Sequence, residues 1–337
     1  MFVIRQPTEA DVPGVLEVAR HLDSVNLPAR KDHVLEFVDH AIRSFSGQLP
    51  PNEREFLFVL EDRDNGRVIG TSMIHAQHGT KRAPHVYFQV LKEDRYSQTL
   101  DRFFRHECLR IGYDYDGPTE IGGLILLPSY RGNSSRLGTL LSYMRFLYIA
   151  MHRSWFRDQV ISELLPPLNP DGTSKLWEHL GKRFTGLTYQ EADLLSKDNK
   201  EFIRALFPHG LIYTSLFPET VRNMIGQVGN ETRGVEKSLK RIGFRFANQL
   251  DPFDGGPHYT AATDSITLVR DSMPYTLKVI SSADESRPWA IVASESPNFR
   301  AIGARVIPME GQILGVTETV RQTLGTDDGG QVWAVLP

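Results

Sequence analysis

The segment from residue 130 to residue 141 carries the residues best suited to chemistry in this sequence. Arg131 and Arg136 supply positive charge for a phosphate group. Gly132 and Gly138 allow close backbone approach or a positive φ, and serines between them can donate hydrogen bonds. The segment leads into a predicted helix, whose first N–H groups and dipole favour an anion. This combination indicates a site for a phosphate or pyrophosphate.

Two well-known phosphate loops do not fit this segment. No Gly-Lys-Ser or Gly-Lys-Thr follows, as a P-loop requires, and the three-glycine fingerprint of dinucleotide-binding folds is absent. A plain surface connection between a strand and a helix remains an alternative, because arginine and serine are common in loops. From the residues alone, both interpretations stay open.

The segment resembles the acyl-CoA site of the GNAT superfamily. There a strand leads into Arg or Gln, x, x, Gly, x, Gly or Ala, and then into a helix that holds the CoA pyrophosphate. Leu127–Gly132 and Leu137–Leu141 match the two flanks, with a slightly longer loop between them. The resemblance implies that backbone groups of the strand bind the pantetheine arm and polarise the thioester carbonyl. It assigns acyl-CoA binding to Leu124, Leu126, Arg131, Gly132, Arg136, Gly138 and Thr139.

Further segments resemble, in the same order, the arginine N-succinyltransferase family over nearly the whole chain. They include Val3-Ile4-Arg5, Phe58–Asp62, Leu180–Phe184, Pro208–Tyr213 and Phe253–Pro257. In that family, succinyl-CoA acylates the α-amino group of arginine during arginine catabolism. The resemblance implies an acyl-CoA-dependent N-acyltransferase, with succinyl-CoA or acetyl-CoA as donor and arginine or a related amine as acceptor.

Two features depart from the family pattern. The family has a histidine proton donor after Ile-Gly-Gln-Val, whereas this chain has Gly229, which has no side-chain proton to give. The substrate loop is also altered, and the resemblance places Ser24 and Asn26 in it as substrate-binding residues. Two alternatives to an active enzyme follow from Gly229: a CoA-binding paralogue without turnover, or a non-catalytic partner subunit.

Three titratable residues are candidates for the amine side of the reaction. Glu120, at the start of the predicted acyl-CoA strand, matches a family glutamate; it either deprotonates the amine or is a surface residue at a strand end. His209 is a candidate replacement acid or base, although a histidine before glycine in a loop is usually solvated. Asp254 either binds a cationic substrate group or caps the turn that follows it.

The candidate residues need both strands and helices to position them. Periodicity and turn signals predict strands at Phe2–Arg5, Phe56–Leu60, Val68–Ile74 and Ile121–Leu127, a helix at Leu137–His152, and β-rich runs after residue 260 that begin with Ile266–Val269. We therefore expect an α+β protein. A GNAT-like acyltransferase domain would cover residues 1–257, and a small β-rich, barrel-like domain would cover residues 258–337.

Composition narrows the possible partners and surroundings. The 337 residues carry a formal net charge of −3, so nucleic acid and anionic membranes are not expected as partners. The single cysteine, Cys108, cannot form an intramolecular disulfide, and no Cys and His cluster has metal spacing, so we expect no metal and a reducing compartment. No uninterrupted apolar stretch is long enough to span a bilayer. We expect a cytoplasmic protein that forms a homo- or hetero-oligomer.

Overall fold

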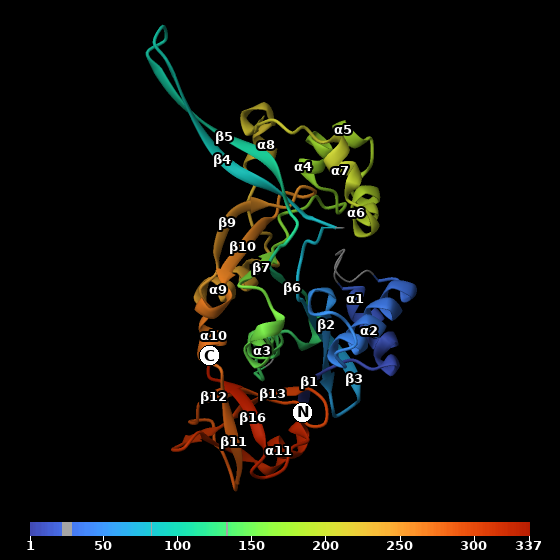
Figure 1. Ribbon diagram of the computed structural model, residues 1–337, viewed down its shortest axis with the longest axis vertical. Helices are drawn as coiled ribbons and strands as arrows, with labels where there is room; N and C mark the ends of the chain where they lie inside the picture. The colour runs from blue at the N-terminus through green and yellow to red at the C-terminus, as the bar shows by residue number, and fades with distance from the viewer. Residues whose placement is uncertain (22–28, 82, 133) are drawn as a thin grey trace. The chain divides into compact units, whose positions relative to one another are not determined.

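A computed structural model gives the fold and describes residues 1–21, 29–81, 83–132 and 134–337 (Figure 1). The chain forms two compact units. Unit 1 comprises residues 1–76, 119–158 and 262–337, and unit 2 comprises residues 77–118 and 159–261. Each unit is therefore assembled from segments that lie far apart in the sequence.

Unit 1 contains a large sheet with the strand order β14-β15-β11-β16-β12-β13-β1-β2-β3-β6. Its strands are β1 (Phe2–Arg5), β2 (Glu55–Asp62), β3 (Arg67–His75), β6 (Thr119–Leu126), β11 (Met273–Ile280), β12 (Trp289–Ser294), β13 (Arg300–Arg305), β14 (Ile307–Met309), β15 (Ile313–Thr317) and β16 (Gln331–Val335). Its helices are α1 (Val12–Ala19), α2 (Lys31–Phe45), α3 (Leu137–Met151), α10 (Thr267–Arg270) and α11 (Glu318–Leu324).

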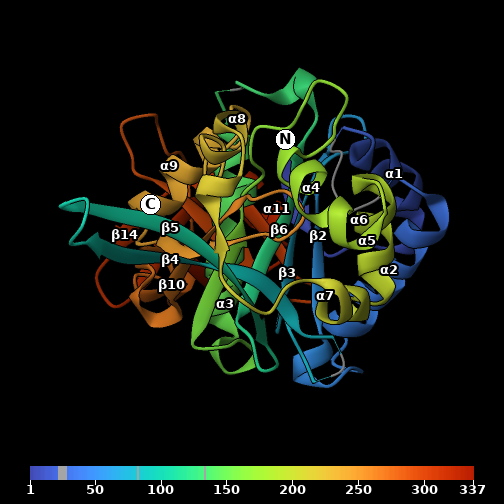
Figure 2. The same ribbon diagram turned by 90° about the horizontal axis from the view of Figure 1, so that it is seen from above.

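The helices of unit 1 cover both faces of its N-terminal strands. α1 and α2 pack against β3 and β2 on one face, and α3 packs on the other (Figures 1 and 2). α2 buries one face, through Val34, Val38 and Ala41, as expected for an amphipathic helix. α3 also contacts β12, β13 and β16, and most of its residues are buried, because sheet strands surround it on more than one side.

The C-terminal strands continue the N-terminal sheet. β13 pairs antiparallel with β1, so that Ala301 lies opposite Ile4. Val3 belongs to the same apolar core as Leu277, Val292 and other residues of the C-terminal strands. The expected α+β class is confirmed, whereas a barrel-like closure of the tail and a domain boundary after residue 257 stay predictions.

One predicted strand is wrong. Ile266–Val269 forms a turn and the short helix α10. Its β-branched residues favoured a strand, but Leu268 and Val269 are buried and α10 packs against α3. Tertiary packing therefore overrides the local preference.

Unit 2 has the strand order β7-β10-β9-β4-β5-β8. Its strands are β4 (His85–Ser97), β5 (Arg102–Asp114), β7 (Gln159–Glu163), β8 (Ile212–Tyr213), β9 (Arg245–Leu250) and β10 (Pro257–Ala262). Its helices are α4 (Lys175–His179), α5 (Gly181–Thr185), α6 (Tyr189–Asp198), α7 (Glu201–Leu206), α8 (Glu219–Arg222) and α9 (Arg233–Arg241). A core centred on Trp177, which stacks on Phe253, holds the strands and helices together.

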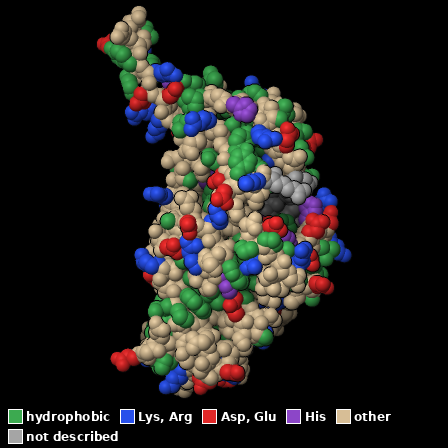
Figure 3. All heavy atoms as spheres, in the orientation of Figure 1, with side chains coloured by type: hydrophobic (Ala, Val, Ile, Leu, Met, Phe, Trp, Pro, Cys, Tyr) green, Lys and Arg blue, Asp and Glu red, His purple; other side chains and the backbone are tan. Residues whose placement is uncertain are grey.

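The hairpin of β4 and β5 extends well beyond the rest of unit 2 (Figure 1). Its far end exposes large apolar side chains, namely those of Tyr96, Leu100, Phe103 and Phe104. Figure 3 shows hydrophobic side chains on the surface of this projecting hairpin. Among the residues that the structure describes, no helix combines the length and apolar character needed to cross a membrane.

Candidate functional site

A bulge at Gly123 kinks β6. Thr71 of β3 pairs with Ile125 and Met73 pairs with Gly122, so β6 has an extra residue between these pairs. Gly123 has a φ of +54°, and its carbonyl oxygen accepts a 3.0 Å hydrogen bond from Thr71 Oγ1. A Cβ atom here would lie 2.6 Å from Met73 Cγ, so the site requires glycine. The bulge leaves Gly123 and Leu124 outside the paired register, and pairing with β3 resumes at Ile125 and Leu126.

A buried arginine of α3 contacts the same bulge. Arg145 is 2% exposed, and its Nη1 donates to the Gly122 carbonyl oxygen at 3.3 Å. Its Nη2 donates to Ser142 Oγ at 3.1 Å. Burial lowers the pKa of Arg145 to about 9. The sequence interpretation missed this residue, although it is the sole charged residue within α3.

The predicted phosphate loop joins β6 to α3 and is exposed to solvent. Arg131 Nε donates a 3.0 Å hydrogen bond to the Leu126 carbonyl oxygen, which folds the loop back onto the strand end. Arg136 has a φ of +54° and precedes α3, and its carbonyl oxygen accepts the 2.9 Å hydrogen bond from Leu140 N. Its guanidinium carbon lies 5.7 Å from the centre of the Trp289 ring. The loop thus places one cation, Arg131, at the end of β6 and another, Arg136, directly before α3.

The start of α3 is open to a ligand. Gly138 and Thr139 are exposed, and a Cβ atom at Gly132 or Gly138 would meet no atom within 4 Å. The first N–H groups of a helix have no acceptor within the helix and favour an anion. Unit 1 therefore brings together on one strand, loop and helix start all the residues predicted to bind acyl-CoA: Leu124, Leu126, Arg131, Gly132, Arg136, Gly138 and Thr139.

Glu120 lies in a row of titratable side chains across the sheet of unit 1. Glu55, His75 and Glu120 face one another in the register of β2, β3 and β6. Glu120 is 3% exposed, so it is not a surface residue. His75 Nδ1 lies 3.2 Å from Glu55 Oε1. The pKa of Glu55 is lower than its ordinary value. Burial alone would raise this pKa, but the charge of His75 and its hydrogen bond to Glu55 have the larger combined effect. Such a row can hold and pass a proton.

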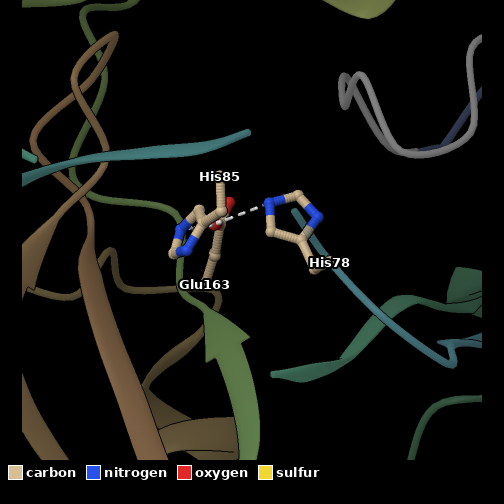
Figure 4. A group of neighbouring side chains, drawn as sticks. All are labelled: His78, His85 and Glu163. Atoms are coloured by element: carbon tan, nitrogen blue, oxygen red, sulfur yellow. Dashed lines mark ion pairs between the residues drawn. The ribbon is translucent and has the colours of Figure 1, made fainter. Parts of the chain in front are cut away.

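Unit 2 gathers three histidines around Glu163 at the end of β7. Glu163 Oε1 lies 3.2 Å from His85 Nε2, 3.5 Å from His258 Nε2 and 3.9 Å from His78 Nε2. Figure 4 shows His78 and His85 on opposite sides of the carboxylate. Burial raises the pKa of Glu163, but the surrounding histidines outweigh burial and lower it well below its ordinary value. The sequence interpretation missed this cluster.

Two aspartates lie on the turn that precedes β10. Asp254 Oδ1 accepts a 2.7 Å hydrogen bond from Gly256 N, which is the capping role considered for it. Burial, and then the charge of Asp251, raise the pKa of Asp254 well above its ordinary value. Asp251 Oδ1 accepts a 2.7 Å hydrogen bond from Phe253 N; burial and the charge of Glu163 raise the pKa of Asp251 to about 7. A contact between Asp254 and substrate stays a prediction.

The backbone around Gly229 packs closely on the segment after β7. Gly229 N donates a 2.8 Å hydrogen bond to the Leu165 carbonyl oxygen, which also accepts from Thr232 Oγ1 at 3.0 Å. A Cβ atom at Gly229 would lie 2.9 Å from the Pro166 carbonyl oxygen. Position 229 therefore has little room for a side chain in this backbone conformation.

A family model described as arginine N-succinyltransferase beta subunit matches residues 2–268. The chain belongs to the arginine N-succinyltransferase family. An arginine N-succinyltransferase of Shigella boydii serotype 18 is 31% identical over 318 residues, which cover 93% of this chain and 92% of the relative. One from Escherichia coli strain 55989 is 31% identical over 322 residues, with 94% and 93% covered.

A solved structure supports the same fold for the whole chain. Subunit AI of the arginine/ornithine succinyltransferase from Pseudomonas aeruginosa is 26% identical and superposes with a TM-score of 0.86, covering 100% of this chain and 98% of that chain. The fold expected from the resemblance is therefore confirmed.

The remaining described residues that the sequence analysis singled out belong to unit 2, whereas the predicted acyl-CoA residues belong to unit 1. His209 is exposed in the turn before β8, and His209, Asp254 and Gly229 all belong to unit 2. Ser24 and Asn26 lie outside the described residues. Their roles in substrate binding or proton transfer stay predictions.

Substitution of Gly229 tests how tightly the backbone is packed there. We expect Gly229→Ala to lower the free energy of unfolding by about 1–3 kcal/mol, because the added Cβ meets backbone oxygens. Chemical denaturation measures this change.

The matched control is Gly234→Ala on the nearby helix α9, where a Cβ atom meets nothing within 4 Å. Alanine in a helix there should leave stability unchanged or raise it. Equal stability of the Gly229→Ala variant and the natural chain would contradict the tight packing.

Proposed function

We propose that this chain transfers the succinyl group of succinyl-CoA to the α-amino group of arginine. The observation that carries the proposal is the bulged strand β6, which runs into an exposed two-arginine loop at the start of α3. This arrangement supports acyl-CoA binding in a chain that belongs to the arginine N-succinyltransferase family over nearly its full length. Succinyl as the acyl group and arginine as the acceptor come from the names of the relatives.

The reaction needs the chain to bind the acyl-CoA, to stabilise the charge on the thioester carbonyl and to accept a proton from the amine. The neutral amine attacks the thioester carbon, a C–N bond forms, the C–S bond breaks, and the amine loses a proton while the departing thiolate gains one. Backbone N–H groups of β6 beyond the bulge would stabilise the charge that develops on the carbonyl oxygen. α3 and its loop would hold the pyrophosphate.

Glu120 is the proposed base for the amine. It is buried in the same strand as Leu124, and its row with His75 and Glu55 gives a removed proton further groups to reach. A carboxylate held away from bulk solvent is suited to this role.

An assay of the purified full chain tests the proposal. With succinyl-CoA and arginine, we expect release of the CoA thiol and a product whose mass equals arginine plus one succinyl group. Acetyl-CoA, ornithine and lysine serve as comparison substrates. Absence of thiol release with every donor and amine would contradict the proposed activity.

Arg136→Ala tests the pyrophosphate site. Because a charge-assisted contact with phosphate is lost, we expect the KM for succinyl-CoA to rise about tenfold while kcat changes little. Arg67→Ala is the control, since Arg67 is also exposed in unit 1 and pairs with Glu17. An unchanged KM in Arg136→Ala would exclude Arg136 from pyrophosphate binding.

Glu120→Gln tests the proposed base. General base catalysis is worth about 10²–10⁴-fold, so we expect kcat to fall within that range while the affinity for succinyl-CoA is kept. Kinetics together with equilibrium CoA binding separate a lost base from a damaged fold. A kcat within about twofold of that of the natural chain would show that another group removes the proton.

A second candidate function is CoA binding without turnover, either alone or as a partner subunit. Glycine at position 229, where the family has its histidine proton donor, favours it. The matching model and the Pseudomonas structure are both named as subunits, and the β4–β5 hairpin exposes apolar side chains that suit contact with another chain. Tight CoA binding without thiol release, with a larger assembly in solution, would favour this candidate.

A further inference from the structure

The three imidazoles around Glu163 come from separate parts of unit 2. His78 precedes β4, His85 begins β4, and His258 lies in β10, while Glu163 ends β7. Their Nε2 atoms lie 3.2–3.9 Å from the same carboxylate oxygen, Glu163 Oε1. The proposed acyl transfer assigns no task to this group.

The spacing of these atoms is that of metal ligands. Ligand atoms placed about 2.0–2.2 Å from a tetrahedral zinc ion lie about 3.3–3.6 Å from one another. Among the three residues His78, His85 and Glu163, the 3.2 Å from Glu163 Oε1 to His85 Nε2 is close to this separation, and the 3.9 Å to His78 Nε2 is slightly longer. His78, His85 and Glu163 each offer a ligand atom, and these atoms lie within 4.8 Å of one another.

The surroundings also suit an ion. The side chain of His85 is 3% exposed, whereas those of His78 and Glu163 are 22% and 25% exposed. One side of the group is therefore held in the protein and the other can be reached from solvent. A site with three protein ligands and one accessible position corresponds to the arrangement in which zinc keeps a water or substrate ligand.

The kind of donor atom selects the kind of ion. Imidazole nitrogens bind zinc and related transition metals, whereas magnesium and calcium prefer sites made of oxygen atoms. Two imidazoles and one carboxylate form a donor set found in zinc enzymes. We propose that His78, His85 and Glu163 bind one divalent transition-metal ion of the zinc class.

Two further titratable residues lie close to the shared carboxylate. His258 is fully buried, and together with Asp251 it forms a second group of possible ligand atoms around Glu163. His258 Nε2 lies 3.5 Å from Glu163 Oε1 and restricts the position of the carboxylate, as partners of metal ligands do in established sites. His258 and Asp251 also provide the alternative site that the experiment has to distinguish.

Metal titration of the full chain tests the proposal. The chain is stripped with a chelator, dialysed, and titrated with Zn²⁺ by calorimetry and with Co²⁺ by visible absorption. We expect one ion per chain and the intense visible bands of four-coordinate Co²⁺. Absence of stoichiometric Zn²⁺ binding would overturn the proposal.

Substitutions identify the ligands. His78→Gln and His85→Gln should each weaken Zn²⁺ binding at least about 10- to 100-fold, since removing a ligand costs at least as much as removing a partner of a ligand. His106→Gln is the control, because His106 lies on β5 opposite Glu93 and pairs with none of the proposed ligands. The Zn²⁺ affinity of this variant should equal that of the natural chain.

Partial exposure of His78 keeps the test informative if the buried His85 variant does not fold. The thermal unfolding temperature of the natural chain should rise with Zn²⁺, and that of a folded His78→Gln variant should rise much less. Zn²⁺ binding that survives in both variants but is lost in Asp251→Asn would assign the ion to the second group and overturn the ligand set proposed here.

Discussion

The bulge at Gly123 is the constraint on which the proposed acyl-CoA site depends. A continuous ladder between β3 and β6 would use the backbone of β6 for sheet pairing along its length. Thr71 and Arg145 instead bond the carbonyl oxygens of Gly123 and Gly122, which stabilises the kink at a position where a side chain would strike Met73. The direction of the loop into α3 follows from where this kinked strand ends.

The buried side chain of Arg145 connects α3 to the bulged strand β6. A helix that is apolar on nearly every side fits between strands, yet this one carries a guanidinium whose pKa burial lowers to about 9. The cost of burying a cation is offset by hydrogen bonds to Ser142 and to the bulge. The helix whose N-terminus would bind the phosphate is thus bonded near its middle to the strand that would bind the thioester.

Unit 2 contains a group of neighbouring carboxyl and imidazole side chains whose charges shift one another's pKa values. Burial, and then the charge of a neighbouring carboxylate, raise the pKa values of Asp251 and Asp254. The histidines around Glu163 lower its pKa instead. The segment after Glu163 packs on Gly229, so the position where a histidine is expected from the family resemblance lies in the same part of the fold as the histidine–carboxylate group.

The sequence by itself determined the local elements and the position of the predicted phosphate loop between a strand and a helix. Apolar periodicity, turn residues and an arginine on each side of the loop are contiguous, so the strand ending near Leu127, the helix from Leu137 and the family resemblance could be identified from neighbouring residues. The type of the segment 266–269 could not, because burial against α3 decided it. Only the tertiary structure placed Arg145 under the bulge, Glu120 beside His75, and His78, His85 and His258 around Glu163. Their spacing along the chain has no metal or catalytic signature, since strand pairing brings these separate segments together.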